Sequence, residues 1–85
     1  MASILNKYQV YILKSLKDGR TYIGSTSDLA KRISEHNRGK ITSTRWHAPY
    51  KLIRSENYLD KTLARKRELF LKTGKGRQII KNLIS

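Results

Sequence analysis

The chain has 85 residues, with 19 lysines and arginines against 6 aspartates and glutamates, no cysteine, and a formal net charge of +13. This length predicts a single domain over residues 1–85 with a thin hydrophobic core that no disulfide supplements. No apolar run approaches the roughly 20 residues of a membrane-spanning helix, so we expect no membrane segment.

The high positive charge favours a polyanionic partner, and nucleic acid is the first candidate. A solvated basic surface without such a partner is the alternative. An anionic membrane is less favoured, because the basic residues are spread over several predicted elements and do not form one amphipathic helix with aromatic anchors. The first six residues lack the charged and apolar regions of a signal peptide, so we expect a cytoplasmic location.

Two strands joined by a tight turn come first along the chain. β-branched and aromatic residues predict strands over residues 8–13 and 21–25. Asp18 and Gly19 are typical loop residues of a two-residue type I′ turn. With that turn the facing pairs are Lys17 with Arg20, Leu16 with Thr21, Ser15 with Tyr22, and Leu13 with Gly24.

This register predicts a face that carries two tyrosines. Because side chains alternate along a strand, Tyr11 and Tyr22 emerge on the same side of the sheet, with Gly24 between them. A tyrosine has a pKa of about 10, so it is a poor base at neutral pH unless nearby cations favour the phenolate. A half-buried strand residue is the alternative role for either tyrosine alone.

A helix is predicted over about residues 28–37, with Ser27 as its N-cap. Arg32 and His36 lie four positions apart, so they share one side of this helix, next to an apolar stripe that faces the sheet. An ordinary solvated Arg and His pair is the alternative. The segment that follows, residues 39–49, has no period and is predicted as an exposed loop.

Within that loop, Lys40 and Arg45 are candidate nucleic-acid contacts. A third strand is predicted over residues 50–58, and a second helix over about residues 61–72, capped by Asp60. The buried side of this helix is predicted to comprise Leu63, Ala64, Phe70 and Leu71.

A third helix is predicted after Gly76, and its apolar residues at helical spacing are expected to pack on the sheet: Ile79, Ile80, Leu83 and Ile84. The fold class is therefore α/β of the α+β kind, a small three-stranded antiparallel sheet flanked by about three helices.

Glu68 is the only carboxylate between residues 61 and 85, among eight basic residues. It is either an ion-pair partner for Arg65 and Lys72 or a hard oxygen ligand for one Mg²⁺ or Mn²⁺ ion, whose other positions water and phosphate oxygens fill. Lys75 and Arg77 precede or open the last helix beside two glycines and are candidate phosphate contacts. A plain turn with solvent-facing charges is the alternative there.

Taken in order, these residues resemble the GIY-YIG nuclease family, in a small single-domain form similar to the nuclease module of the excision-repair incision subunit. Val10-Tyr11-Ile12 stands at the first triplet, with Val10 in place of glycine, and Tyr22-Ile23-Gly24 matches the second triplet unaltered. Arg32 and His36 match the family's helical arginine and histidine. Glu68 matches its metal-binding glutamate.

The resemblance implies hydrolysis of DNA phosphodiester bonds with one divalent metal and no small-molecule cofactor. In that scheme Glu68 holds the ion, Arg32 binds phosphate charge, and Tyr22 or Tyr11, helped by His36, activates water. Gly24 belongs to the face that meets DNA. We expect a structure-selective or weakly sequence-specific endonuclease in DNA repair or recombination, because spread cations hold the backbone without reading bases. The alternatives are a non-catalytic nucleic-acid-binding module on the same fold and a domain that binds an acidic protein.

Overall fold

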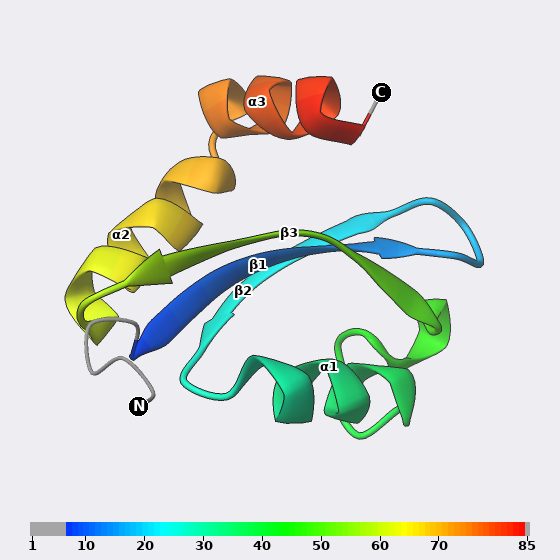
Figure 1. The fold of residues 1–85 in the computed structure, drawn as a ribbon. Helices are drawn as coiled ribbons and strands as arrows, with labels where there is room; N and C mark the ends of the chain where they lie inside the picture. Colours follow the sequence, from blue (N-terminus) through cyan, green and yellow to red (C-terminus); the bar gives the residue numbers. More distant parts are fainter. Residues whose placement is uncertain (1–6, 85) are drawn as a thin grey trace.

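The computed structural model describes residues 7–84, so residues 1–6, on which the signal-peptide expectation depends, lie outside the described residues. A three-stranded antiparallel sheet of order β2-β1-β3 carries three helices, as the sequence predicts (Figure 1). The elements are β1 (Tyr8–Ser15), β2 (Thr21–Thr26), α1 (Leu29–Asn37), the 3-10 helix η1 (Arg45–His47), β3 (Tyr50–Tyr58), α2 (Lys61–Leu71) and α3 (Gly74–Ile84). Within residues 7–84 no helix has the length and apolar character needed to cross a membrane.

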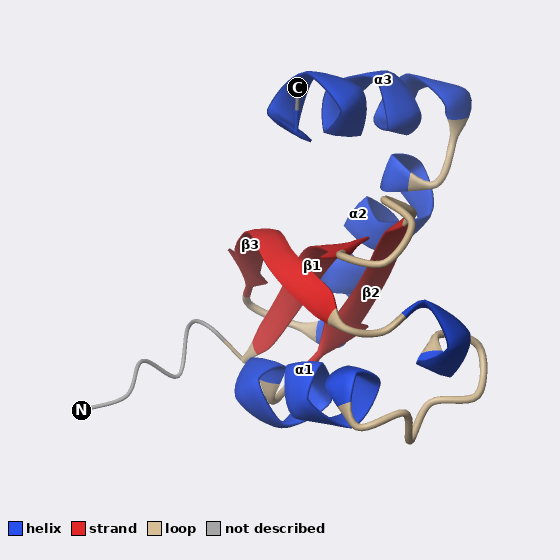
Figure 2. Cartoon of the chain, turned by 90° about the vertical axis from the view of Figure 1, so that its right-hand side faces the viewer, coloured by secondary structure: helices blue, strands red, loops and turns tan. Residues whose placement is uncertain are grey.

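The sheet is covered on both faces, by α1 on one side and by α2 and α3 on the other (Figures 1 and 2). Its central strand β1 is therefore buried on both sides. On the α2 and α3 side the core comprises Val10, Ile12, Ile23, Ala64, Leu71 and Ile80. On the α1 side it comprises Tyr11, Leu13 and Tyr50, packed against Tyr22, Leu29, Ile33 and Ala48. Because successive side chains of β1 point to opposite faces of the sheet, this strand contributes to two thin hydrophobic cores.

The turn between β1 and β2 differs from the predicted type I′ turn. A type I′ turn needs positive φ at both central residues, but among the described residues only glycines have positive φ, here Gly19 at 77°. Ser15 N instead donates to Arg20 O at 2.7 Å, which closes a four-residue loop. Tyr11 consequently faces Gly24, and Leu13 faces Tyr22. The predicted register was wrong by two residues, and a shift of two keeps both tyrosines on one face.

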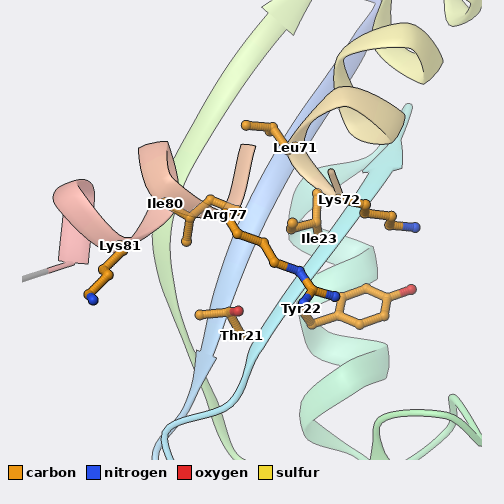
Figure 3. A pocket seen from close by; sticks show the side chains of 8 residues that line it. All are labelled: Thr21, Tyr22, Ile23, Leu71, Lys72, Arg77, Ile80 and Lys81. Atoms are coloured by element: carbon orange, nitrogen blue, oxygen red, sulfur yellow. The ribbon is translucent and has the colours of Figure 1, made fainter. Parts of the chain in front are cut away.

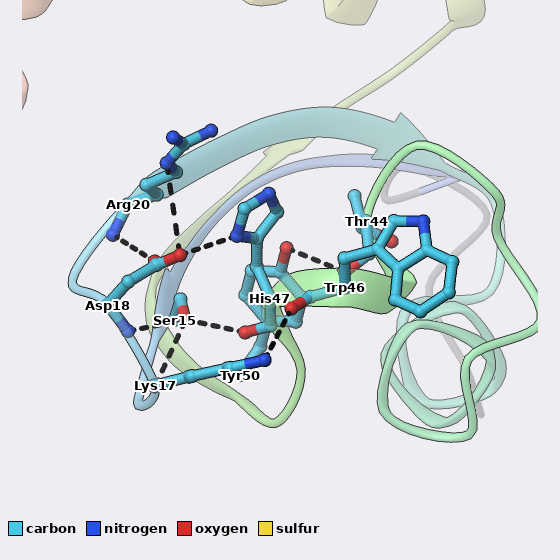
Figure 4. A network of polar contacts seen from close by, with 8 residues as sticks. All are labelled: Ser15, Lys17, Asp18, Arg20, Thr44, Trp46, His47 and Tyr50. Atoms are coloured by element: carbon cyan, nitrogen blue, oxygen red, sulfur yellow. Dashed lines mark hydrogen bonds and ion pairs between the residues drawn. The ribbon is translucent and has the colours of Figure 1, made fainter.

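Contacts with η1 hold the four-residue loop between β1 and β2 in place, as Figure 4 shows. Ser15 Oγ accepts from the backbone N–H groups of Lys17 and Asp18, both at 3.1 Å, and donates to His47 O at 2.5 Å. The Asp18 carboxylate bonds His47 Nδ1 at 2.5 Å, and Lys17 Nζ donates to Trp46 O at 3.2 Å. Contacts distant in sequence therefore set the turn.

The helices begin close to their predicted positions. Asp28, not Ser27, caps α1 by accepting from Lys31 N at 3.2 Å, and Asp60 caps α2 by accepting from Leu63 N at 2.9 Å. The buried side of α2 comprises Ala64, Glu68 and Leu71. The predicted burial of Leu63 and Phe70 is wrong, because both flank this stripe and remain 42% and 37% exposed.

Helix α3 begins at Gly74, three residues earlier than predicted. Gly76 lies inside it and is buried against the end of α2, where a Cβ would lie 2.5 Å from the carbonyl carbon of Leu71. This glycine therefore lets the two helices approach closely. Of the apolar residues expected on the sheet, Ile80 is buried and Leu83 is 40% exposed. The side chain of Ile84 lies outside the described residues.

Candidate active site

The side chain of Tyr11 crosses the edge strand β2 at Gly24. A Cβ built on Gly24 would lie 2.7 Å from Tyr11 Cζ, closer still to the Tyr11 hydroxyl, and 3.1 Å from Tyr22 Cε2. Any side chain at position 24 would displace the phenol. Gly24, predicted as a DNA contact, is itself buried, and in the structure it provides the space in which the Tyr11 hydroxyl lies.

A hydrogen-bonded chain runs from Tyr11 through His36 to Thr44. His36 Nε2 lies 3.0 Å from Tyr11 Oη, and its Nδ1 lies 2.8 Å from Thr44 Oγ1. Thr44 Oγ1 donates to the carbonyl of Ile41 at 3.4 Å, so it accepts from His36 Nδ1–H. This network assigns the tautomer, leaving Nε2 to accept the proton of the Tyr11 hydroxyl.

Burial sets the protonation state of this pair. Burial, reinforced by the positive charge of Arg32, lowers the pKa of His36 below its ordinary value of 6.5. Burial also raises the pKa of Tyr11, while a hydrogen bond from Arg32 opposes that rise. At neutral pH the phenol is therefore protonated and the imidazole is neutral. His36 Nε2 is the proton acceptor of the pair.

Aromatic rings fix the imidazole in place. The His36 ring centroid lies 4.8 Å from that of Tyr22, 5.8 Å from that of Tyr11 and 5.9 Å from that of Tyr50. Tyr50 Oη also donates to Thr44 O at 3.0 Å. Sequence reasoning missed Thr44 and Tyr50 as site residues. Thr44 lies in a polar loop whose apolar residues show no helical or strand periodicity, so no local pattern distinguishes it.

Arg32 lies on the same side of the sheet as the tyrosines and projects from α1. Its side chain is 38% exposed, and Nη1 lies 3.4 Å from Glu35 Oε1. Its hydrogen bond to Tyr11 raises the pKa of the guanidinium. Arg32 therefore connects the buried phenol to the surface, where a guanidinium can bind phosphate oxygens.

Glu68 is buried and ionised. Its side chain accepts from Ser25 Oγ at 2.8 Å, from Lys72 Nζ at 2.9 Å and from Arg65 Nη1 at 3.3 Å. Burial alone would raise the pKa of Glu68, but the hydrogen bonds from Lys72 and Ser25 and the charges around it lower that pKa overall. The ion-pair role that the sequence left open is thus present, at a residue only 5% exposed.

The five predicted catalytic residues meet at the edge strand β2, on two sides of it. Tyr11, Tyr22, Arg32 and His36 gather on the α1 side, whereas Glu68 bonds Ser25 on the α2 side. The carboxylate of Glu68 nevertheless contributes to the raised pKa of Tyr11. The two parts of the site therefore share one electrostatic environment across the strand that contains Gly24.

The remaining predicted nucleic-acid residues belong to the loop after α1, to η1 and to the start of α3. Lys40 is exposed after α1, and the Arg45 guanidinium lies 4.7 Å from the Trp46 ring centroid in η1. Lys75 and Arg77 belong to the first turn of α3, and only Arg77 lines a cavity that reaches Tyr22.

Acidification is expected to destabilise the protein through His36. In the unfolded chain His36 takes up a proton near pH 6.5. In the folded protein, burial and the positive charge of Arg32 lower the pKa of His36, and the negative charge of Glu35 opposes this shift. The contribution of the neutral His36 to the stability of the fold is therefore fully present above pH 6.5, and it is lost as the pH falls through the lowered pKa of His36. Urea unfolding between pH 7.5 and 5 measures this loss. A His36→Gln variant should show a flatter dependence, and an unchanged slope would contradict the assignment.

Comparisons with known proteins identify a family and several similar chains. The family described as the GIY-YIG catalytic domain matches residues 7–81. A UPF0213 protein from Staphylococcus saprophyticus is 39% identical over 70 residues, covering 81% of this chain and 84% of that protein. A UPF0213 protein from Clostridium perfringens is 44% identical over 64 residues, covering 74% of this chain and 68% of that protein.

A solved structure is also similar. The solution NMR structure of the UPF0213 protein BH0048 from Bacillus halodurans is 32% identical, with a TM-score of 0.54, and the match covers 89% of this chain and 83% of that one. The family match, the sequence identity and the fold thus agree. The chain belongs to the GIY-YIG nuclease family, among small single-domain UPF0213 proteins.

Proposed function

We propose that the protein is a divalent-metal-dependent endonuclease that hydrolyses DNA phosphodiester bonds with structural selectivity or weak sequence specificity, in DNA repair or recombination. The observation that supports this most is the 3.0 Å contact between Tyr11 Oη and the neutral imidazole of His36, held in its accepting tautomer by Thr44. A base and a hydroxyl in hydrogen-bond contact form the basic unit of proton-transfer catalysis.

In this proposal Tyr11 relays a proton and is never a free phenolate. Water that attacks phosphorus gives a proton to Tyr11 Oη, while the Tyr11 proton passes to His36 Nε2. This transfer uses a group whose pKa is already lowered by burial, so the base form is present at neutral pH. Arg32, beside the phenol, binds the charge that develops on the phosphoryl oxygens.

Glu68 would hold the metal ion, for which Mg²⁺ or Mn²⁺ is the expected choice. Mg²⁺ commonly takes one or two carboxylates and fills its other positions with water and phosphate oxygens. The ionised Glu68 fits this requirement, and within residues 7–84 no cluster of three metal-binding side chains supplies another site. When bound, the ion polarises the phosphate.

A non-catalytic DNA-binding module is the second candidate, and one observation favours it. Lys72 Nζ and Arg65 Nη1 already neutralise the Glu68 carboxylate at 2.9 and 3.3 Å, so a metal ion would have to displace them. The lysine and arginine side chains are 46% and 59% exposed, which allows them to turn into solvent.

The test is cleavage of branched, flapped and plain duplex DNA by the purified protein, with Mg²⁺ and with EDTA. Metal-dependent cutting, fastest on branched or flapped DNA, is expected of the endonuclease. Binding without cutting in any metal would instead favour the non-catalytic module.

Binding is expected to fall steeply with salt, because the net charge of +13 favours phosphate contacts over base contacts. With about five phosphate contacts, the slope of log K against log salt for duplex DNA is roughly −4 to −5. Fluorescence anisotropy at 50 to 300 mM salt measures it. A slope near zero, or equal affinity for a neutral-backbone analogue, would contradict phosphate-dominated binding.

A further inference from the structure

A cavity of about 500 Å³ lies between the edge strand β2 and the helices α2 and α3 (Figure 3). Its lining combines three kinds of side chain: Ile23, Leu71 and Ile80 are apolar, Lys72, Arg77 and Lys81 are basic, and Tyr22 and Thr21 come from β2. The volume falls in the range of small-ligand sites, about 300 to 1,000 Å³.

The cations around this cavity are available to a ligand. Within residues 7–84 neither the Arg77 guanidinium nor the Lys81 ammonium forms an ion pair or a side-chain hydrogen bond, and both residues are exposed. Figure 3 shows the Arg77 side chain extending from α3 toward Tyr22. No carboxylate lines the cavity, so its charge attracts an anion.

The cavity adjoins the candidate active site through two of its own residues. Tyr22 lines the cavity, and its ring lies 6.3 Å from that of Tyr11 and 4.8 Å from that of His36. Lys72 lines it as well and bonds Glu68 at 2.9 Å. A DNA strand bound at the candidate active site can therefore place a neighbouring nucleotide at this opening.

We propose that this cavity binds one unpaired nucleotide of the DNA strand, next to the phosphate that is cut. This rests on the proposed function. The base lies against the apolar floor and the Tyr22 ring, and Arg77 and Lys81 bind the adjoining phosphates. Apolar and aromatic contact combined with cations is how proteins hold single strands, whereas a base inside a duplex is stacked and cannot enter.

The experiment measures DNA binding in metal-free buffer, so that no cleavage occurs. The probes are a fluorescent single strand and a flapped duplex, each also made with one abasic nucleotide placed at successive positions. Thr21→Phe fills the mouth of the cavity at an exposed strand position, and Arg77→Gln removes one of the three positive charges that line it. Matched controls on the other edge strand, β3, are Asn57→Phe and Lys51→Gln, both at exposed positions.

For the unaltered protein, an abasic nucleotide at one particular position should weaken binding about 5- to 150-fold, the range of one base stacked on a protein surface. Thr21→Phe should abolish that difference, and Asn57→Phe should preserve it. Arg77→Gln should weaken binding to both probes more than Lys51→Gln does.

The outcomes separate the two proposals. A flat abasic scan, or equal behaviour of Thr21→Phe and Asn57→Phe, in a protein that binds and cuts DNA overturns the nucleotide site alone. An unaltered protein that binds neither probe overturns the proposed function, and the nucleotide site with it. Thermal unfolding of every variant confirms that a loss of binding does not reflect a loss of folding.

Discussion

Replacing Glu68 by glutamine is expected to abolish Mg²⁺-dependent cleavage while DNA binding stays equal or tightens. A neutral amide is a poor ligand for Mg²⁺, and the change removes one negative charge from a basic surface. Glutamine can still accept from Ser25, and the exposed Lys72 and Arg65 can turn into water, so the fold is retained. Initial cleavage rates, anisotropy and thermal unfolding in EDTA measure the three effects.

Glu56→Gln is the matched control for this change. Glu56 is partly buried and ion-paired, and its pKa is lowered mainly by the hydrogen bond from Arg67. Glu56→Gln also removes one negative charge, but on β3 at the other edge of the sheet, so it should leave the cleavage rate unchanged. Full activity in a contaminant-controlled Glu68→Gln protein would refute the metal site and favour the binding-module function.

Replacing Tyr11 by phenylalanine is expected to lower the cleavage rate about 10²- to 10⁴-fold, the usual effect of losing a proton-transfer group. The change removes only the hydroxyl that bonds His36 Nε2 at 3.0 Å. It leaves a buried imidazole nitrogen without its partner, which costs about 1–3 kcal/mol of stability. Single-turnover cleavage at saturating protein separates this rate effect from DNA binding, which should be unchanged.

Tyr22→Phe is the comparison that identifies the proton-transfer residue. The Tyr22 hydroxyl has no hydrogen-bond partner within residues 7–84, whereas its ring packs 4.8 Å from that of His36. Phenylalanine retains the packing, so the rate should fall less than in Tyr11→Phe. A larger loss in Tyr22→Phe would assign proton transfer to Tyr22. Parental rates in both variants would refute a role for the shared tyrosine face.

Local sequence signals predicted the elements of this fold well, because their causes are local. Apolar residues among polar ones, with Leu52 and Ile53 between two tyrosines, predicted the strand β3 over Tyr50–Tyr58, and the Asp60 side chain caps α2 as expected. Strand periodicity also placed Tyr11 and Tyr22 on one face. That conclusion held despite the wrong turn, because the register error was an even number of residues.

Other features depended on contacts between distant segments, so no local pattern could reveal them. The Asp18 turn is set by η1, whose His47 follows 29 positions later. Thr44 reaches His36 only because the loop after α1 folds back over that helix. The exposure of Leu83 follows from where α3 packs, since a helical apolar stripe says which side is apolar and not how much of it is covered.

By itself, the sequence determined the basic surface, the three strands and three helices, and the order of the tyrosines, arginine, histidine and glutamate on which the resemblance to the GIY-YIG nuclease family rests. Only the tertiary structure decided that Gly24 makes room for the Tyr11 phenol, that Thr44 sets the tautomer of His36, and that Glu68 approaches from the opposite side of β2. The physical reason is that residue types and their periodicity are local properties, whereas hydrogen-bond partners, burial and the pKa shifts that burial causes arise only when separate elements pack together.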